Sequence, residues 1–235
     1  MKGWRQMDYQ IIQINKNTWR IEEEGVRFFL LTGTEKALLI DSGMAVHNAK
    51  DIAETLTDLP VSLLNTHADM DHIGSNGQFA FFYMHPAEEK NYRQAGRNGE
   101  ILPVVDGDEL DLGNRKLRII HLPGHTEGSI AVLDVDARVL ISGDPVQEHG
   151  RIFMFGEHRD MKEYISSLEK LKEMNDFDEL WPSHADIPIS PDVIGKLLEG
   201  ARKVMNGEIT GTIGAFHGMK FKVYDLGFTA LLGDA

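Results

Sequence analysis

Five short apolar runs in this chain are each followed by histidine or aspartate, and this pattern constrains the fold more than any other. One run leads to Asp41, and "VSLLNT" leads directly into "HADMDH", residues 67–72. Three later runs are followed by His125, Asp144 and His184. Short apolar runs bounded by turn residues are typical of buried strands. Because α/β sheets place ligand sites at the carboxyl ends of their strands, the pattern predicts a fold built around one polar site.

Strand-like and helix-like segments alternate along the whole chain. Helical spacing or helix-start signals are found at 45–59, 86–95, 159–174 and 191–205, and 220–233 has the pattern of a hairpin. Strands are expected at 9–15, 18–23, 26–33, 36–41, 61–66, 79–84, 116–122, 129–135, 138–144 and 178–183. With no linker or repeat in sight, we expect a single domain over residues 1–235, of mixed α/β class, in which helices sandwich two sheets.

Composition excludes several kinds of site and partner. The chain has no cysteine, so disulfides, thiolate metal ligands and iron–sulfur clusters are excluded, and any metal must be bound by nitrogen and oxygen atoms. The formal net charge is −13 and no basic stretch is present, which argues against a nucleic-acid partner. No apolar run approaches the ~18 residues of a membrane helix. Because residues 1–10 lack the apolar stretch of a secretory signal, we expect a cytoplasmic protein with no membrane partner.

Four motifs in sequence order resemble those of the metallo-β-lactamase-fold hydrolases. They are "HADMDH", the histidine in "PGHTEGS", the aspartate in "SGD" and the late histidine in "PSHAD". The family pattern begins H-x-H-x-D-H and continues with the same three elements, and the early aspartate in "LLIDSG" also matches. The resemblance covers nearly the whole chain. It implies a four-layer αββα sandwich with two divalent metal ions in a groove at its edge.

The resemblance also implies a ligand for each position of a two-metal centre. Zinc is the metal expected first, with iron or manganese as alternatives, because imidazole and carboxylate ligands suit all three. Asp41 is expected to accept the second N–H of a ligand histidine and so fix its ring. Site one takes His67, Asp69 and His125, site two takes Asp71, His72 and His184, and Asp144 bridges both.

Asp69 stands where the family pattern has a histidine, and three interpretations stay open. In the first, its carboxylate ligates site one. In the second, it parallels the glutamate that the similar flavodiiron oxygen and nitric oxide reductases have at this position, and it favours iron or manganese. In the third, the side chain falls short and leaves site one weak. Charge counting shows the consequence. With Asp69, Asp71 and Asp144 ionised, one bridging hydroxide makes a centre of two divalent ions neutral, whereas histidine at 69 leaves it positive. Asp69 therefore predicts a weaker Lewis acid.

The leading functional hypothesis is a dinuclear metal-dependent hydrolase that acts on a small ester, thioester or lactone through a metal-bound water. Asp71 is expected to hold one metal and to take the proton of the attacking water. One alternative is a di-iron redox enzyme that lacks a flavodoxin module and receives electrons from a separate flavoprotein. The other is a non-catalytic metal-binding domain. The partner is expected to be a small molecule, and neither its identity nor the oligomeric state follows from these motifs.

Residues 145–160, "PVQEHGRIFMFGEHRD", offer side chains for a substrate pocket. Phe153 and Phe155 would line its apolar part, and His149, His158 or Arg159 would bind a substrate carboxylate. The competing interpretation is a loop that packs into the core and exposes its histidines. His217 either closes over the groove or faces solvent.

Overall fold

The computed structural model describes residues 9–216 and 218–235, so His217 lies outside the described residues. Two large sheets and one smaller sheet contain the strands. The seven-stranded sheet has the order β1 (Gln10–Asn15), β2 (Thr18–Glu23), β3 (Val26–Thr32), β4 (Ala37–Ile40), β5 (Val61–Leu64), β6 (Phe81–Met84), β7 (Glu100–Pro103). The five-stranded sheet has the order β13 (Glu179–Pro182), β11 (Val139–Gly143), β10 (Ile130–Asp134), β9 (Lys116–His121), β8 (Glu109–Asp111). The four-stranded sheet has the order β12 (Arg151–Met154), β16 (Ala230–Asp234), β15 (Met219–Asp225), β14 (Thr212–Phe216).

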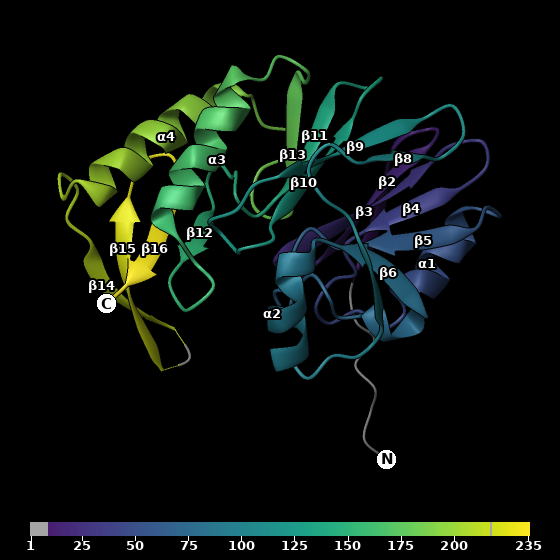
Figure 1. Cartoon of the computed structure of the whole chain (residues 1–235), viewed down its shortest axis with the longest axis horizontal. Coiled ribbons are helices and arrows are strands. Elements are labelled where there is room, and N and C mark those ends of the chain that lie inside the picture. Colours follow the sequence, from purple (N-terminus) through teal and green to yellow (C-terminus); the bar gives the residue numbers. More distant parts are fainter. Residues whose placement is uncertain (1–8, 217) are drawn as a thin grey trace.

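The helices form the two outer layers of a sandwich around the large sheets (Figure 1). Helices α1 (Ala49–Leu56) and α2 (Glu89–Gln94) pack on the seven-stranded sheet, and α3 (Met161–Glu173) and α4 (Asp192–Met205) pack on the five-stranded one. Short 3₁₀ turns occur at η1 (Asn76–Gln78) and η2 (Pro86–Glu88). This arrangement confirms the predicted four-layer αββα fold. No helix of the described residues is long and apolar enough to cross a membrane.

Each central strand is apolar on both faces because helices cover one face and the other sheet covers the second. In β3, Phe28 and Leu30 pack under α1 and α2, whereas Phe29 and Leu31 face the other sheet. Strand β10 shows the same alternation on its two faces. Successive strand side chains point to opposite faces, so a strand buried on both sides needs a continuous apolar run. This pairing of faces places one core between the sheets and one under each pair of helices.

Strand directions bring the expected site residues to one edge of the sandwich. Strands β4 and β5 are parallel neighbours. In the second sheet β9 and β11 are both antiparallel to β10, and β13 is parallel to β11, so β9, β11 and β13 run the same way. The loops after these five strands carry the polar residues that follow the apolar runs of the sequence, and the next section gives their contacts.

The C-terminal region forms more sheet than the sequence predicts. The expected hairpin is present as β15 and β16. However, residues 151–154, which were expected in a pocket wall or in a loop packed into the core, form β12 and pair in parallel with β16. The reason is that β12 obtains its hydrogen-bond partners from a strand almost 80 residues later in the chain, and such pairing leaves no local signal.

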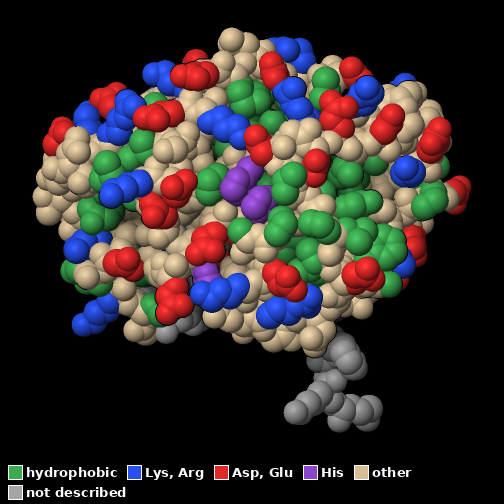
Figure 2. Space-filling view, viewed as in Figure 1, with side chains coloured by type: hydrophobic (Ala, Val, Ile, Leu, Met, Phe, Trp, Pro, Cys, Tyr) green, Lys and Arg blue, Asp and Glu red, His purple; other side chains and the backbone are tan. Residues whose placement is uncertain are grey.

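On the face drawn in Figure 2, Lys and Arg side chains alternate with Asp and Glu among apolar groups. The coloured residues of that face therefore offer no continuous basic strip.

Candidate metal centre

The loops after β5, β9, β11 and β13 bring the seven predicted ligands together. Three groups have ligand atoms within 4.8 Å of one another. Two of them correspond to the expected sites, and the third, His67, His72 and Asp144, takes members from both. The first group is His67, Asp69 and His125, and the second is Asp71, His72 and His184.

All four histidines are oriented in the same way. Each ring has its Nδ1 occupied by a hydrogen bond and its Nε2 turned toward the carboxylates of the centre. His125 donates to the Phe153 carbonyl oxygen at 2.9 Å, and His184 donates to the carbonyl oxygen of Gly25. A histidine held at one ring nitrogen presents the other as a ligand in a fixed direction.

Asp41 and Thr66 hold the other two rings. Asp41 accepts the Nδ1–H of His72 at 2.8 Å and the hydroxyl hydrogen of Thr66 at 2.8 Å. The Thr66 hydroxyl oxygen then accepts from Nδ1 of His67, 3.0 Å away. Asp41 is 1% exposed, so these hydrogen bonds are shielded from water. Asp41 thus fixes one ring directly and a second ring through Thr66, whereas the sequence suggested only one contact.

Asp144 lies between the two groups. Its Oδ1 is 3.2 Å from Nε2 of His72 and 3.1 Å from Nε2 of His184, and its Oδ2 is 3.6 Å from Nε2 of His125. Among the described residues, Oδ1 of Asp144 and Nε2 of His72 are buried without a hydrogen-bond partner. Because a buried polar atom without a partner is costly, these atoms and the nitrogen and oxygen donors around them fit divalent metal ions.

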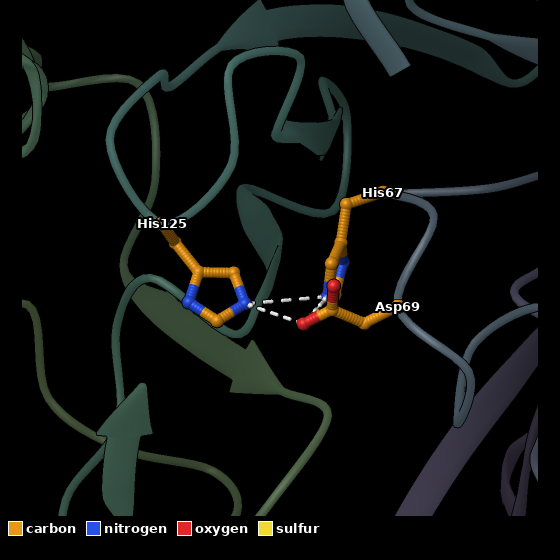
Figure 3. A group of neighbouring side chains, drawn as sticks. All are labelled: His67, Asp69 and His125. Carbon is orange, nitrogen blue, oxygen red and sulfur yellow. Dashed lines mark hydrogen bonds and ion pairs between the residues drawn. The ribbon is translucent and has the colours of Figure 1, made fainter. Parts of the chain in front are cut away.

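Asp69 reaches the centre and also contacts a cation. Figure 3 shows its carboxylate beside the rings of His67 and His125, which come from two different loops. Oδ2 of Asp69 is 3.5 Å from Nε2 of His67 and 3.4 Å from Nε2 of His125. The same oxygen accepts a hydrogen bond from Nη2 of Arg159. Asp69 therefore has the reach that a ligand of site one needs. Arg159, which the sequence offered for a substrate carboxylate, contacts the Asp69 carboxylate.

The carboxylates and histidines shift one another's pKa values. Burial would raise the pKa of Asp69, but hydrogen bonds with His125 and His67 and the Arg159 charge hold it well below its usual range. Burial would lower the pKa of His184, but Asp144 and Asp71 raise it to about 10. Asp144 in turn stays ionised because His184 and His72 outweigh the effect of burial on its pKa. The centre is thus built to hold positive charge.

Glu88 connects the two ligand loops of site one, and sequence reasoning missed it. This side chain is 1% exposed. Its Oε2 accepts the backbone N–H of Ala68 at 2.7 Å, and its Oε1 accepts the backbone N–H of Gly128 at 2.8 Å. One carboxylate therefore ties the loop of His67 to the loop of His125. A glutamate in a predicted helix start carries no signal of this role, because both partners are distant backbone groups.

Two loop positions require glycine because other chain segments approach closely. A Cβ on Gly74 would lie 2.5 Å from the carbonyl oxygen of Gly43. Gly124 has φ +127, and a Cβ there would lie 2.2 Å from the backbone nitrogen of Tyr164 in α3. These contacts let the loops that carry His72 and His125 pack tightly on their neighbours.

A cavity of about 480 Å³ opens beside the candidate metal ligands. Of the four residues expected in a substrate pocket, Phe153 lines it. Phe155 stacks on Phe221 at a ring-centroid distance of 5.4 Å. His149 pairs with Asp186, and His158 with Gln94. The remaining lining residues are Asp69, Met70, Asp71, Asp144, Gln147, Gly150, Arg151, His184 and Ala185.

Comparison with known proteins identifies the family. A sequence profile described as "Metallo-beta-lactamase superfamily" matches residues 22–184 and so includes every position of the centre. The chain belongs to the metallo-beta-lactamase superfamily. This confirms the predicted resemblance.

Two kinds of hydrolase are among the relatives of this chain. Human acyl-coenzyme A thioesterase MBLAC2 is 26% identical over 212 residues, which cover 70% of this chain and 75% of the human protein. A hydroxyacylglutathione hydrolase of Gloeobacter violaceus is 32% identical over 142 residues, covering 58% of this chain and 55% of that protein. With the family match, these relatives confirm that the chain is a metallo-hydrolase.

Solved structures support the fold. A metallo-beta-lactamase from Pontibacter korlensis has a TM-score of 0.70 at 15% sequence identity and covers 83% of this chain and 99% of that one. The metallo-beta-lactamase IND-7 also has a TM-score of 0.70, at 18% identity, with the same coverage. At these identities the likeness concerns architecture and not substrate.

Proposed function

We propose that this chain, as one domain, hydrolyses a small thioester at a dinuclear metal centre. The observation that carries the proposal is the shared carboxylate of Asp144, whose two oxygens face two separate ligand groups. The seven side chains His67, Asp69, Asp71, His72, His125, Asp144 and His184 would hold the ions. Zinc fits this donor set best, with iron or manganese as the alternatives that the Asp69 carboxylate allows. When bound, the ions would supply Lewis acidity to the substrate carbonyl and to the attacking water.

Asp71 is the residue we assign to proton transfer. Its side chain lines the cavity and is 29% exposed, and its Oδ2 lies 3.3 Å from Nε2 of His184. Burial would raise the pKa of Asp71, but the charge of His72 and the hydrogen bond from His184 lower it, so the carboxylate is ionised at neutral pH. Its second oxygen is then available to accept a proton from the attacking water.

The cavity suggests how a thioester would lie. Met70 and Phe153 give apolar surface for an acyl chain, and Gln147 and Arg151 give polar groups to the same cavity. Acyl-coenzyme A and hydroxyacylglutathione, for which the relatives above are named, are both thioesters, and this favours a thioester over an oxygen ester or a lactone. The di-iron redox alternative has no counterpart among those relatives.

The experiment is a thiol-release assay on zinc-loaded protein with acyl-coenzyme A esters of increasing chain length and with lactoylglutathione. Because the chain has no cysteine, a thiol reagent detects only the product. We expect thiol release that is lost after chelation and regained with zinc. Turnover of a lactone or an oxygen ester of the same acyl group, with none of the thioesters cleaved, would refute the thioester assignment. Elemental analysis that finds iron, together with oxygen consumption, would favour the redox alternative.

A further inference from the structure

Arg159 is a basic side chain at the edge of site one that the proposed hydrolysis does not use. Its Nη2 donates to Oδ2 of Asp69, the oxygen that faces His67 and His125. The side chain of Arg159 is 11% exposed and that of Asp69 is 24% exposed. Charges in such a partly buried pair interact more strongly than charges on an open surface.

The fold fixes Arg159 in this place. The next residue, Asp160, caps α3 by accepting the backbone N–H groups of Lys162 and Glu163. The backbone N–H of Asp160 also donates to the carbonyl oxygen of Gly124 at 2.9 Å, beside the loop of His125. The backbone beside Arg159 is therefore held between a helix start and a ligand loop, and its guanidinium lies against Asp69.

The charge of Arg159 matches the charge that distinguishes Asp69 from the family pattern. A neutral imidazole at position 69 would bring no charge, whereas the Asp69 carboxylate brings one negative charge to the centre. Arg159 brings one positive charge to the same oxygen. The pair thus leaves the net charge around the metals as it would be with histidine at 69 and no arginine nearby.

We propose that Arg159 is a positioning residue of the metal centre, which orients Oδ2 of Asp69 toward site one and offsets the negative charge of that carboxylate. Asp69 and Arg159 then act together in place of the family's histidine. This inference rests on the proposed dinuclear centre, but it is independent of the thioester substrate.

The test measures Zn²⁺ affinity by competition with a chromophoric chelator, on metal-free protein whose folding is checked by circular dichroism. Asp69→His alone should weaken zinc binding by about tenfold or more, because the imidazole cannot offset the adjacent guanidinium. The double variant Asp69→His/Arg159→Gln should return to within about threefold of the wild type. Arg159→Lys, which keeps the charge, should also stay within about threefold.

Arg118→Gln is the matched control, because Arg118 pairs with Asp176 on a partly exposed part of the second sheet and should leave zinc affinity unchanged. The inference is overturned if Asp69→His binds zinc as tightly as the wild type, or if the double variant binds as weakly as Asp69→His. If the wild type binds no zinc, the proposed centre itself fails. Should the histidine variants not fold, loss of zinc affinity in Arg159→Lys would overturn the charge argument.

Discussion

At the scale of single residues, the centre stabilises positive charge before it performs any chemistry. Asp144 carries ionised oxygens toward His72 and His184, and the pKa values of both histidines are raised. Metal ions binding here must displace protons from imidazole rings, so metal affinity and pH are linked. The same groups make the stability of the metal-free protein depend on pH.

Metal removal should expose this dependence. The pKa of His184 is raised from 6.5 to about 10, mainly by Asp144 against the effect of burial. A raised folded-state pKa stabilises the fold fully below pH 6.5, and this contribution is lost as pH rises to about 10. The melting temperature of chelated protein should therefore fall between pH 7 and 10, and zinc-loaded protein should lack this fall. An equal decline in both forms would contradict the prediction.

Glu88 stabilises the fold through hydrogen bonds to two backbone groups that are distant in the sequence. In Glu88→Gln one amide oxygen replaces a carboxylate that accepts from Ala68 and Gly128, and the amide NH₂ faces a second donor. We expect a loss of about 1–3 kcal/mol in the free energy of unfolding, measured by urea denaturation. Glu89→Gln is the control, since that side chain is 59% exposed, and should change stability by less than about 0.5 kcal/mol. Equal effects in both variants would exclude the loop connection.

At the scale of elements, the β2–β3 hairpin supports the segment of His184. That segment follows β13, a strand of the other large sheet. Gly25 in the turn accepts from Nδ1 of His184. Arg27 at the start of β3 donates to the carbonyl oxygens of Pro182 at 3.1 Å and Ala185 at 2.6 Å. These contacts bracket His184 on both sides, so the first sheet positions a ligand of the second.

Arg27→Gln should therefore weaken zinc at site two more than at site one. We expect a loss of about tenfold in affinity, because partners that orient a ligand contribute this much. Chelator titration that resolves two binding steps measures it. Arg20→Gln is the control, because Arg20 pairs with Glu22, as Arg27 does, and makes no hydrogen bond to the His184 segment among the described residues. A similar loss at both sites would show that Arg27 acts on the fold and not on His184.

At the scale of the whole molecule, one buried arginine joins the two large sheets away from the centre. Arg115 precedes β9, at the end opposite the loop of His125, and pairs with Asp134 of β10. It also donates to the Asn17 carbonyl oxygen at 2.7 Å and to the Thr18 hydroxyl at 2.9 Å, both in the first sheet region. Its contacts serve stability and not chemistry.

Arg115→Met should lower the free energy of unfolding by about 3–5 kcal/mol, because it leaves the Asp134 carboxylate buried without its partner. The zinc content of the folded variant should be unchanged. Urea denaturation and elemental analysis test the two halves of this prediction. Arg138→Gln is the control, because it removes an exposed pair with Asp178 and should leave the free energy of unfolding nearly unchanged. A lowered zinc content in folded Arg115→Met would contradict the separation of stability from the site.

Local patterns in the sequence determined the family, the layered fold and the set of candidate metal ligands. The continuous apolar runs of strands such as β3 and β10 reflect burial on both faces, and such a run is a property of consecutive residues. The candidate metal ligands follow the carboxyl ends of strands. The carboxyl ends of parallel strands lie at one edge of a sheet, and this does not depend on the conformation of the loops. Both signals are short-range, so they are visible in the chain itself.

Tertiary structure alone decided how these donors are held. Arg159 contacts Asp69 across 90 residues of chain, and Glu88 joins backbone groups 20 residues before it and 40 residues after it. The parallel pairing of β12 with β16 is equally distant. Such contacts depend on where whole elements pack, and an arginine or glutamate has the same local pattern whether it faces solvent or a carboxylate. The ligands were therefore predictable from sequence, whereas the charge balance around Asp69 required the folded chain.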